Sequence, residues 1–208
     1  MRGLDPHITG ALEVLEQAAE RFDRIAIACS FQKEASVVLD LALEVARDKI
    51  DVFTLDTGVL FEETKVAWAE FEDHFAITIA GDRGVWPARL WETDPDACCH
   101  ARKVVPLRDR LAGYDAWITG VRRDQSATRR DTEPIAWDAK HGLFKVAPLA
   151  DWSDRDVWSH ISDRGLPYHA LHDQGYASIG CVPCTRPGEG REGRWAGTDK
   201  IECGLHAA

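Results

Sequence analysis

Apolar residues in the first part of the chain follow two patterns, a helical repeat and a short unbroken run. Residues 11–22 carry Leu12, Leu15, Ala19 and Phe22 at helical spacing, and a short apolar run, 25–29, follows and predicts a buried strand. The same patterns then predict a helix over 35–47, a strand over 51–56 and a helix over 61–75. They continue with a strand over 76–80, a helix over 96–111 and a strand over 115–119.

Strands that alternate with helices in this order predict an α/β fold with an open, mostly parallel sheet and helices on both faces. Such sheets bind ligands at the carboxyl ends of their strands. Three predicted strand ends carry polar loops, namely Cys29-Ser30-Phe31-Gln32, Leu55-Asp56-Thr57-Gly58 and Gly120-Val121-Arg122-Arg123. Each could be an ordinary turn, but three at one edge favour a nucleotide cleft.

The pattern becomes less regular after residue 140. Residues 152–163 predict a helix with Ser153 as its N-cap and Asp156 at the capping-box position. Residues 164–208 are rich in Gly, Pro and Arg and hold three of the six cysteines. We expect mostly loop there, ordered by whatever the cysteines bind.

Composition and charge narrow the class of protein. The fractions of 45% hydrophobic and 29% charged residues are those of a soluble globular protein. The net charge of -10 disfavours nucleic acid as a partner, because phosphate binding requires a basic surface. No apolar run approaches the ~20 residues of a membrane span, and the N-terminus has no signal-peptide core. We therefore expect a cytoplasmic protein with no membrane partner.

Arginine is locally dense in this acidic chain. One cluster lies within 122–130 and a second within 186–194. Such clusters indicate either a confined anion site or a solvated face with ion pairs, and charge alone leaves both interpretations open.

The cysteines point to metal binding or catalysis, because cytosolic chains seldom use cysteine for disulfides. Cys181 and Cys184 form a C-x-x-C pair, and Cys98 and Cys99 are adjacent. Adjacent side chains on a helix diverge, so they suit a single zinc ion poorly. A [4Fe–4S] cluster spreads its irons and accepts divergent thiolates. Spacing favours the cluster over zinc or a pair of disulfides.

The two remaining cysteines differ in context. Cys29 ends a predicted strand, and we interpret it as a small core residue. Cys203 lies in Glu202-Cys203-Gly204-Leu205-His206, where a lone cysteine is ordinarily an exposed thiol. Gly204 gives backbone freedom, and His206 could stabilise a thiolate, so Cys203 is also a candidate nucleophile.

Together these motifs resemble the assimilatory adenylyl-sulfate reductases of the phosphoadenylyl-sulfate reductase family. The resemblance covers roughly residues 25 to 206. It rests on this ordered set: Leu55-Asp56-Thr57-Gly58, Cys98-Cys99, 118–126, Leu166-Pro167-Tyr168, 175–180, Cys181-Val182-Pro183-Cys184-Thr185-Arg186-Pro187 and Glu202-Cys203-Gly204-Leu205-His206. Cys29 departs from the small hydroxyl or aliphatic residue expected there.

The resemblance implies an adenine nucleotide alpha hydrolase-like fold related to the ATP pyrophosphatases, with residues 30–36 as the phosphate loop. It implies a [4Fe–4S] cluster on Cys98, Cys99, Cys181 and Cys184. Lys103, Arg129, Arg191 and Arg194 would surround the phosphosulfate, and Ser30, Leu55, Asp56, Thr57, Gly120 and His206 would complete the substrate site. The whole chain, 1–208, would be one reductase domain, with a nucleotide-binding sheet core over 25–150 and a cluster-binding loop and mobile catalytic tail over 164–208.

The activity implied is the reduction of adenylyl sulfate to sulfite and AMP, with Cys203 as nucleophile and a separate thioredoxin as electron donor. Three alternatives stay open: the 3′-phosphorylated substrate, an ATP pyrophosphatase, and a non-enzymatic iron–sulfur regulator. Residues 30–36 lack the glycines of an S-G-G-x-D-S loop, which argues against ATP hydrolysis. The sequence leaves the oligomeric state open, a homo-oligomer included.

Overall fold

The computed structural model describes residues 5–82, 88–196, 198–200 and 202–206. The first half contains α1 (Pro6–Arg21), β1 (Ile25–Ala28), α2 (Lys33–Ala46), β2 (Ile50–Leu55), α3 (Glu62–Phe75) and β3 (Ala80–Asp82). Then come α4 (Leu90–Thr93), α5 (Pro95–Cys99), a π-helical turn (His100–Val104), α6 (Val105–Leu111), β4 (Ala116–Ile118), β5 (Ile135–Asp138), β6 (Leu143–Val146) and α7 (Asp154–Arg164).

The strands form one six-stranded sheet in the order β3-β2-β1-β4-β6-β5. All neighbours are parallel except β5, which pairs antiparallel with β6 at the edge. Ile25 of β1 lies opposite Ile50 on one side and Ala116 on the other, which places β1 at the centre. The predicted α/β fold with a mostly parallel sheet is confirmed.

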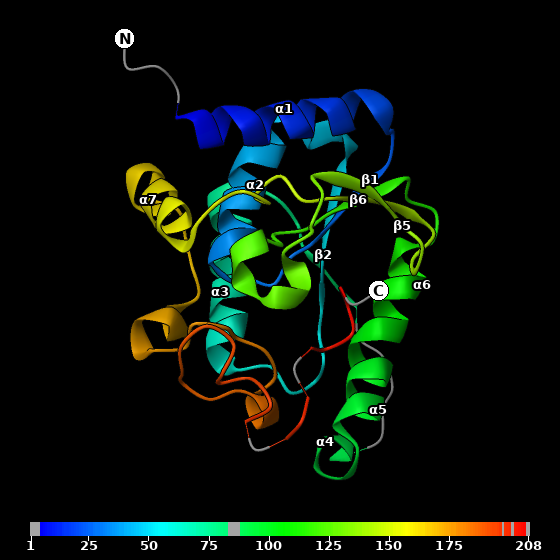
Figure 1. Ribbon diagram of the computed structural model, residues 1–208, viewed down its shortest axis with the longest axis vertical. Coiled ribbons are helices and arrows are strands. Elements are labelled where there is room, and N and C mark those ends of the chain that lie inside the picture. Colours follow the sequence, from blue (N-terminus) through cyan, green and yellow to red (C-terminus); the bar gives the residue numbers. More distant parts are fainter. Residues whose placement is uncertain (1–4, 83–87, 197, 201, 207–208) are drawn as a thin grey trace.

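Each central strand divides its side chains between two apolar layers, because successive residues point to opposite faces. Ile25 and Ile27 pack on the face covered by α1, α2, α3 and α7, and Ala26 packs with Leu107 and Leu111 of α6 on the other (Figure 1). The α1–α2–α3–α7 layer holds the larger core. Both faces of the sheet are therefore covered, as the sequence predicts.

The third strand lies later than predicted. We expected it over 76–80, but Ala76 is the left-handed C-cap of α3, and β3 spans only Ala80–Asp82. The backbone N–H of Ile77 donates to the carbonyl of Glu72, and that of Ile79 donates to the Glu72 carboxylate. The backbone N–H groups of Ile77 and Ile79 therefore bond to Glu72 of α3 and cannot pair with a neighbouring strand.

The β5–β6 hairpin is absent from the sequence-based expectations. Each strand has only four residues, which is too short for a clear alternation of apolar and polar positions to mark it. The connecting turn begins at Asp138, whose side chain accepts from the backbone N–H groups of Lys140 and His141.

The predicted helix over 96–111 is divided into three parts. The π-helical turn His100–Val104 follows the adjacent cysteines directly, and Pro106 at the start of α6 has no N–H for the carbonyl of Arg102. The capping box of α7 is as predicted, with Ser153 and Asp156 bonded reciprocally. Within the described ranges, no helix combines the length and apolar character needed to span a membrane.

Candidate active site

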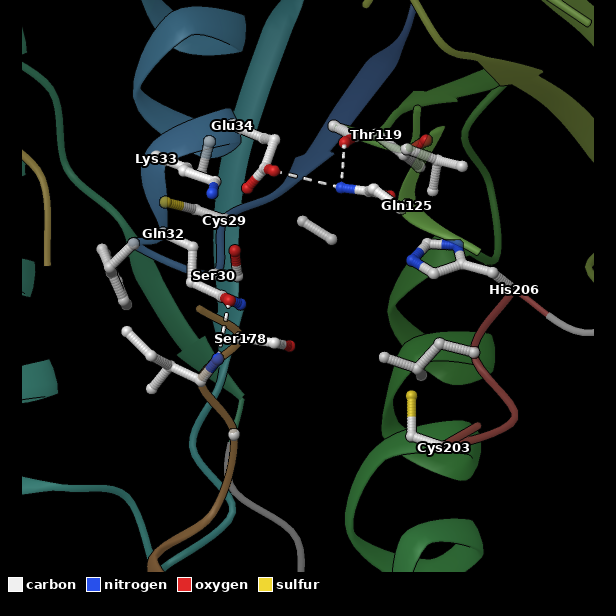
Figure 2. A pocket seen from close by; sticks show the side chains of 18 of the residues that line it. Cys29, Ser30, Gln32, Lys33, Glu34, Thr119, Gln125, Ser178, Cys203 and His206 are labelled. Atoms are coloured by element: carbon white, nitrogen blue, oxygen red, sulfur yellow. Dashed lines mark hydrogen bonds between the residues drawn. The ribbon is translucent and has the colours of Figure 1, made fainter. Parts of the chain in front are cut away.

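A cavity of about 440 Å³ opens at the carboxyl ends of β1, β2 and β4. Its size is that of a small-molecule site. Figure 2 shows Cys203 and His206 on one wall, facing Ser30, Gln32 and Ser178 across the cavity. The lining therefore joins the loops that follow the sheet to the C-terminal segment.

The loop after β1 forms the floor of this cavity in an unusual conformation. Phe31 has φ of 59°, in the left-handed region that glycine adopts most easily. Its ring is buried and packs against Trp68 and Phe71 of α3, with centroids 5.7 and 5.5 Å away. This burial offsets a backbone cost of about 1–2 kcal/mol. The Gln32 side chain accepts from the backbone N–H of Ile179 at 2.8 Å and ties the loop to the C-terminal region.

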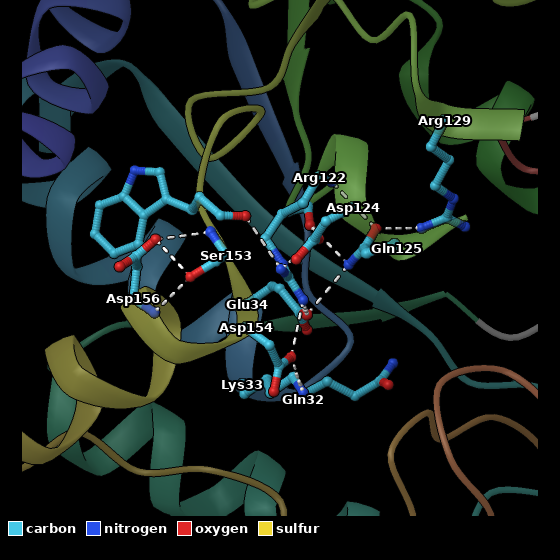
Figure 3. Close-up of polar contacts among 12 residues, drawn as sticks. Gln32, Lys33, Glu34, Arg122, Asp124, Gln125, Arg129, Ser153, Asp154 and Asp156 are labelled. Atoms are coloured by element: carbon cyan, nitrogen blue, oxygen red, sulfur yellow. Dashed lines mark hydrogen bonds and ion pairs between the residues drawn. The ribbon is translucent and has the colours of Figure 1, made fainter. Parts of the chain in front are cut away.

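Beside the loop, two cations pair with three carboxylates in a network that also lines the cavity (Figure 3). Lys33, which is buried, pairs with Asp154 at 2.5 Å. The buried guanidinium of Arg122 contacts the carboxylates of Glu34 and Asp154 at 3.0 Å each and of Asp124 at 2.5 Å. We call these five residues the loop network. Arg122 also lines the cavity, but three carboxylates already contact its guanidinium, so its main role is to hold the loop in place.

The four cations expected around a phosphosulfate, Lys103, Arg129, Arg191 and Arg194, all line the cavity. Arg194 donates to the Ser178 hydroxyl and the Ile179 carbonyl, both at 3.2 Å. The Nε groups of Arg129 and Arg194 and the Thr119 hydroxyl are buried without a hydrogen-bond partner in the described structure. Buried donors of this kind require an acceptor, so the cavity is equipped for an anion.

The C-terminal segment brings Cys203 beside these cations. The side chains of Lys103 and Arg191 are close enough to interact electrostatically with the Cys203 thiol. Burial, together with the charges of Lys145 and Arg129, lowers the pKa of His206 well below its ordinary value. His206 is therefore neutral at physiological pH, and the positive charge near Cys203 comes from lysine and arginine.

Most of the predicted site residues are brought together. Cys203, Ser30, Leu55, Thr57, Lys103, Gly120, Arg129, Arg191, Arg194 and His206 line the cavity. Asp56 is outside the described lining, and its carboxylate accepts from the backbone N–H of Gly58 at 2.9 Å. Sequence reasoning missed Thr119 and Ser178, although both lie inside the motifs that carried the resemblance.

The other four predicted residues, Cys98, Cys99, Cys181 and Cys184, line one small neighbouring cavity with Trp91 and Trp195. All four are free thiols. Lys103 and Arg194 line both cavities. Whatever the thiols bind therefore lies beside the anion site.

The donor set fits an iron–sulfur cluster. Four thiols from two distant segments line this cavity, and four thiolates are the ligand set of a [4Fe–4S] cluster. Among the described residues, no three His, Cys, Asp or Glu side chains are already gathered closely enough to hold a metal ion. Polar neighbours are in place: Cys181 lies 3.2 Å from the Thr57 hydroxyl, and Arg102 hydrogen-bonds to Cys98. Burial raises the pKa of Cys99 to about 11, so binding a metal would release its proton.

Comparison with known proteins gives consistent results. Residues 24–187 match the model of the phosphoadenosine phosphosulfate reductase domain. The chain is 44% identical to the adenosine 5′-phosphosulfate reductase of Geobacillus kaustophilus, covering 98% of this chain and 93% of that one. It is 42% identical to the enzyme of the same name from Bacillus pumilus, with coverage of 95% and 91%.

Solved structures show the same fold. A phosphoadenylyl-sulfate reductase from Candida auris, crystallised with phosphate, superposes with a TM-score of 0.75 at 25% identity, over 85% of this chain and 90% of that chain. The FMN adenylyltransferase of Candida glabrata, with FMN and an ATP analogue, gives a TM-score of 0.67 at 17% identity over 87% and 63%. At that identity the likeness extends to the fold alone.

Proposed function

Because the chain belongs to the phosphoadenosine phosphosulfate reductase family, it is an enzyme of sulfate reduction, and we propose that it reduces adenylyl sulfate to sulfite and AMP through an S-sulfonate on Cys203. The closely similar relatives named adenosine 5′-phosphosulfate reductase support this choice of nucleotide. The six free thiols suit a reducing compartment, so we place the reaction in the cytoplasm.

One observation carries the proposal: the Cys203 thiol shares a nucleotide-sized cavity with Lys103, Arg129, Arg191 and Arg194. A thiolate and a phosphosulfate are both anionic and repel each other. The cations offset this repulsion, and the planar guanidinium of arginine suits sulfate and phosphate oxygens. The site thus combines a soft nucleophile with an anion-binding surface.

In the first step, the Cys203 thiolate attacks the sulfur atom of the substrate. An S–S bond forms, the bond from sulfur to the bridging oxygen breaks, and AMP leaves with that electron pair. The phosphate is a good leaving group, and covalent attack divides a difficult reduction into two easier steps. Arg129, Arg191 and Arg194 would hold the oxygens of the anion while charge moves onto AMP.

In the second step, a thiolate of thioredoxin attacks the Cys203 sulfur and displaces sulfite. The resulting mixed disulfide is resolved by the second thioredoxin thiol, which restores Cys203. Thioredoxin is oxidised to its disulfide, and its two electrons account for the reduction of sulfate to sulfite. This step needs no electron from a metal group of the enzyme.

We further propose that Cys98, Cys99, Cys181 and Cys184 hold a [4Fe–4S] cluster. The shared thiol-lined cavity and its polar neighbours support this assignment. When bound, the group would order the walls that carry Lys103 and Arg194 and tune the electrostatic field at the anion site. Lys103 and Arg194 would then contact the substrate from the wall that both cavities share.

The test is intact-mass spectrometry of anaerobically purified protein mixed with adenylyl sulfate in the absence of reductant. We expect the gain of one SO₃ group, located on Cys203 by peptide mapping and removed by reduced thioredoxin with release of sulfite. The Cys203→Ser variant should bind nucleotide but form no adduct, because it lacks the thiolate.

The same experiment with the 3′-phosphorylated nucleotide decides between the two substrates. A faster reaction with the 3′-phosphorylated form would replace the assigned substrate. An adduct on a different cysteine, or turnover by Cys203→Ser, would refute the mechanism. No adduct with either nucleotide would favour a protein that binds nucleotide without reducing it.

A further inference from the structure

The segment that carries Cys203 is held at several points that the proposed reaction does not by itself require. On its N-terminal side, the Glu202 carboxylate contacts Arg191 at 2.9 Å and Arg129 at 3.3 Å. On its C-terminal side, residues 204–206 contact the β5–β6 turn and β4. A substrate bound to the arginines would compete with the contact on the N-terminal side but not with the contacts on the C-terminal side.

The β5–β6 turn donates to the backbone of the C-terminal segment. Lys140 Nζ lies 2.5 Å from the Gly204 carbonyl, and His141 Nε2 lies 3.3 Å from the Leu205 carbonyl. Because a carbonyl only accepts, Nε2 of His141 must carry the proton. Two adjacent turn residues thus bind two adjacent carbonyls. A backbone interaction of this kind fixes the path of the chain next to Cys203.

Aromatic packing completes the contact. The His206 ring stacks on Trp117 of β4 with centroids 5.3 Å apart and 12° between planes. The Trp117 indole is buried and donates to the Asp138 carboxylate at the start of the same turn. His141 packs edge-on against Trp117, with centroids 5.4 Å apart. The turn, the tryptophan and the segment therefore form one packed unit.

The other contact cannot persist during catalysis if Arg129 and Arg191 bind the phosphosulfate. The substrate anion would take the place of the Glu202 carboxylate. The segment would then lose its contact on the N-terminal side of Cys203 when Cys203 must attack. The contacts of 204–206 involve no residue that we assign to the substrate oxygens. These contacts of residues 204–206 can therefore persist when the substrate is bound.

We propose that the β5–β6 turn and Trp117 form a docking site for residues 204–206, and that Lys140 and His141 are positioning residues that keep Cys203 over the anion site. The docking site acts through the backbone carbonyls on either side of Leu205 and does not touch the reacting atoms. This inference rests on the proposed function for its role in catalysis, but the docking itself can be tested without turnover.

The test compares wild-type holoenzyme with the double variant Lys140→Met, His141→Phe, which removes both donors but keeps the length and the ring. First, Cys203 is labelled with a bulky maleimide without nucleotide, and the label is located by peptide mapping. Second, S-sulfonate formation is followed in a single turnover with adenylyl sulfate. Third, the Kd for AMP is measured.

We expect labelling of Cys203 to become about tenfold faster and S-sulfonate formation about tenfold or more slower, because a poorly held nucleophile loses its orientation. The Kd for AMP should stay within about twofold, since a purely structural defect would weaken binding as well. Lys65→Met is the matched control, because among the described residues the Lys65 ammonium makes a single, exposed ion pair, with Glu62 on α3.

Unchanged or slower labelling of Cys203 in the double variant would refute the docking site. Faster labelling with an unchanged rate of S-sulfonate formation would refute the positioning role. If wild-type protein forms no S-sulfonate, the proposed function fails, while the labelling result still decides whether 204–206 are docked on the turn.

Discussion

At the scale of single residues, Glu202 places a carboxylate on two of the arginines that we propose bind the substrate anion. Its carboxylate bridges Arg129 and Arg191, and all three side chains are largely buried. Charge-assisted pairs of this kind are strong when solvent is excluded. The free enzyme therefore contains an internal competitor for the two arginines that would bind the substrate.

Replacing that competitor should strengthen substrate binding. In a Cys203→Ser background, which prevents turnover, Glu202→Gln is expected to lower the Kd for adenylyl sulfate by about three- to tenfold, because no carboxylate has to be displaced. Isothermal titration calorimetry measures the change. Glu62→Gln, which alters an exposed pair on α3, is the control. Weaker binding by Glu202→Gln would mean that the carboxylate helps to hold the substrate instead.

The residue types of the site could be predicted from sequence, but their partners could not. Cysteine spacing and the arginine clusters singled out the thiols and the cations. The bridge from Glu202 to Arg129 joins segments 73 positions apart, so it depends on the complete fold. The same holds for the buried hydroxyl of Thr119, which is notable only because the structure gives it no described partner.

At the scale of elements, a partly buried charge cluster joins α2 to α7. Asp40 of α2 accepts from His160 at 2.8 Å and from Arg164 at 3.0 and 3.2 Å. Burial acts to raise the pKa of Asp40, but the hydrogen bonds and charges of His160 and Arg164 outweigh it, so that the pKa lies below its ordinary value. The folded state therefore favours the charged carboxylate.

Asp40→Asn should destabilise the protein in a pH-dependent way. A carboxyl whose pKa is lowered on folding stabilises the fold above its unfolded pKa of ~3.9, and this contribution is lost as pH falls through the lower folded value. We expect a loss of about 1–3 kcal/mol at pH 7, or roughly 5 °C in Tm.

Thermal unfolding followed by circular dichroism from pH 7 to pH 3 measures this effect. The difference between wild type and Asp40→Asn should narrow only below about pH 4. Asp23→Asn is the control, because that carboxylate is 94% exposed in its pair with Lys49 and should contribute little. A difference that is the same at pH 7 and pH 3 would rule out the carboxylate charge as its source.

Elements with strong periodicity were predictable, and those shaped by tertiary contacts were not. α2 and α3 have long apolar repeats, and both lie close to their predicted ranges. β3 begins later than predicted because two backbone N–H groups of the expected strand, those of Ile77 and Ile79, bond to Glu72 instead. β5 and β6 are held by pairing across a hairpin and by packing of Phe144 against Phe22, which no local pattern reveals.

At the scale of the whole molecule, the fold class was predictable because the strand–helix order fixes the layers. The spacing of the cysteines already favoured one cluster shared by the two distant pairs, and the family resemblance added the assignment of all four ligands. In the structure, residues of 91–103 and 181–195 line the thiol-lined cavity, and no residue of a sheet strand is among the described lining. Figure 1 shows α4 and α5 at the end of the molecule away from α1. If the four thiols hold the proposed [4Fe–4S] cluster, this region and the sheet core should differ in their dependence on metal.

Removal of iron with an anaerobic chelator should reveal this difference. We expect four additional reactive thiols, mapped to Cys98, Cys99, Cys181 and Cys184, and proteolytic cleavage within 181–195, with little change in far-ultraviolet circular dichroism. S-sulfonate formation should fall by about a hundredfold, because Lys103 and Arg194 lose their support. Iron-free protein that reacts at the original rate would contradict the proposed role of the group.

The loop network also bears on how the sequence around the loop after β1 can change. The buried guanidinium of Arg122 contacts the largely buried carboxylate of Glu34, and the two residues lie far apart in the chain. Replacing Arg122 by a neutral residue would leave that carboxylate without its ion-pair partner, at a cost of about 3–5 kcal/mol. Asp154 is half exposed, so its loss should cost less. We therefore expect positions 34 and 122 to vary together among related sequences, and position 154 to be less tied to either.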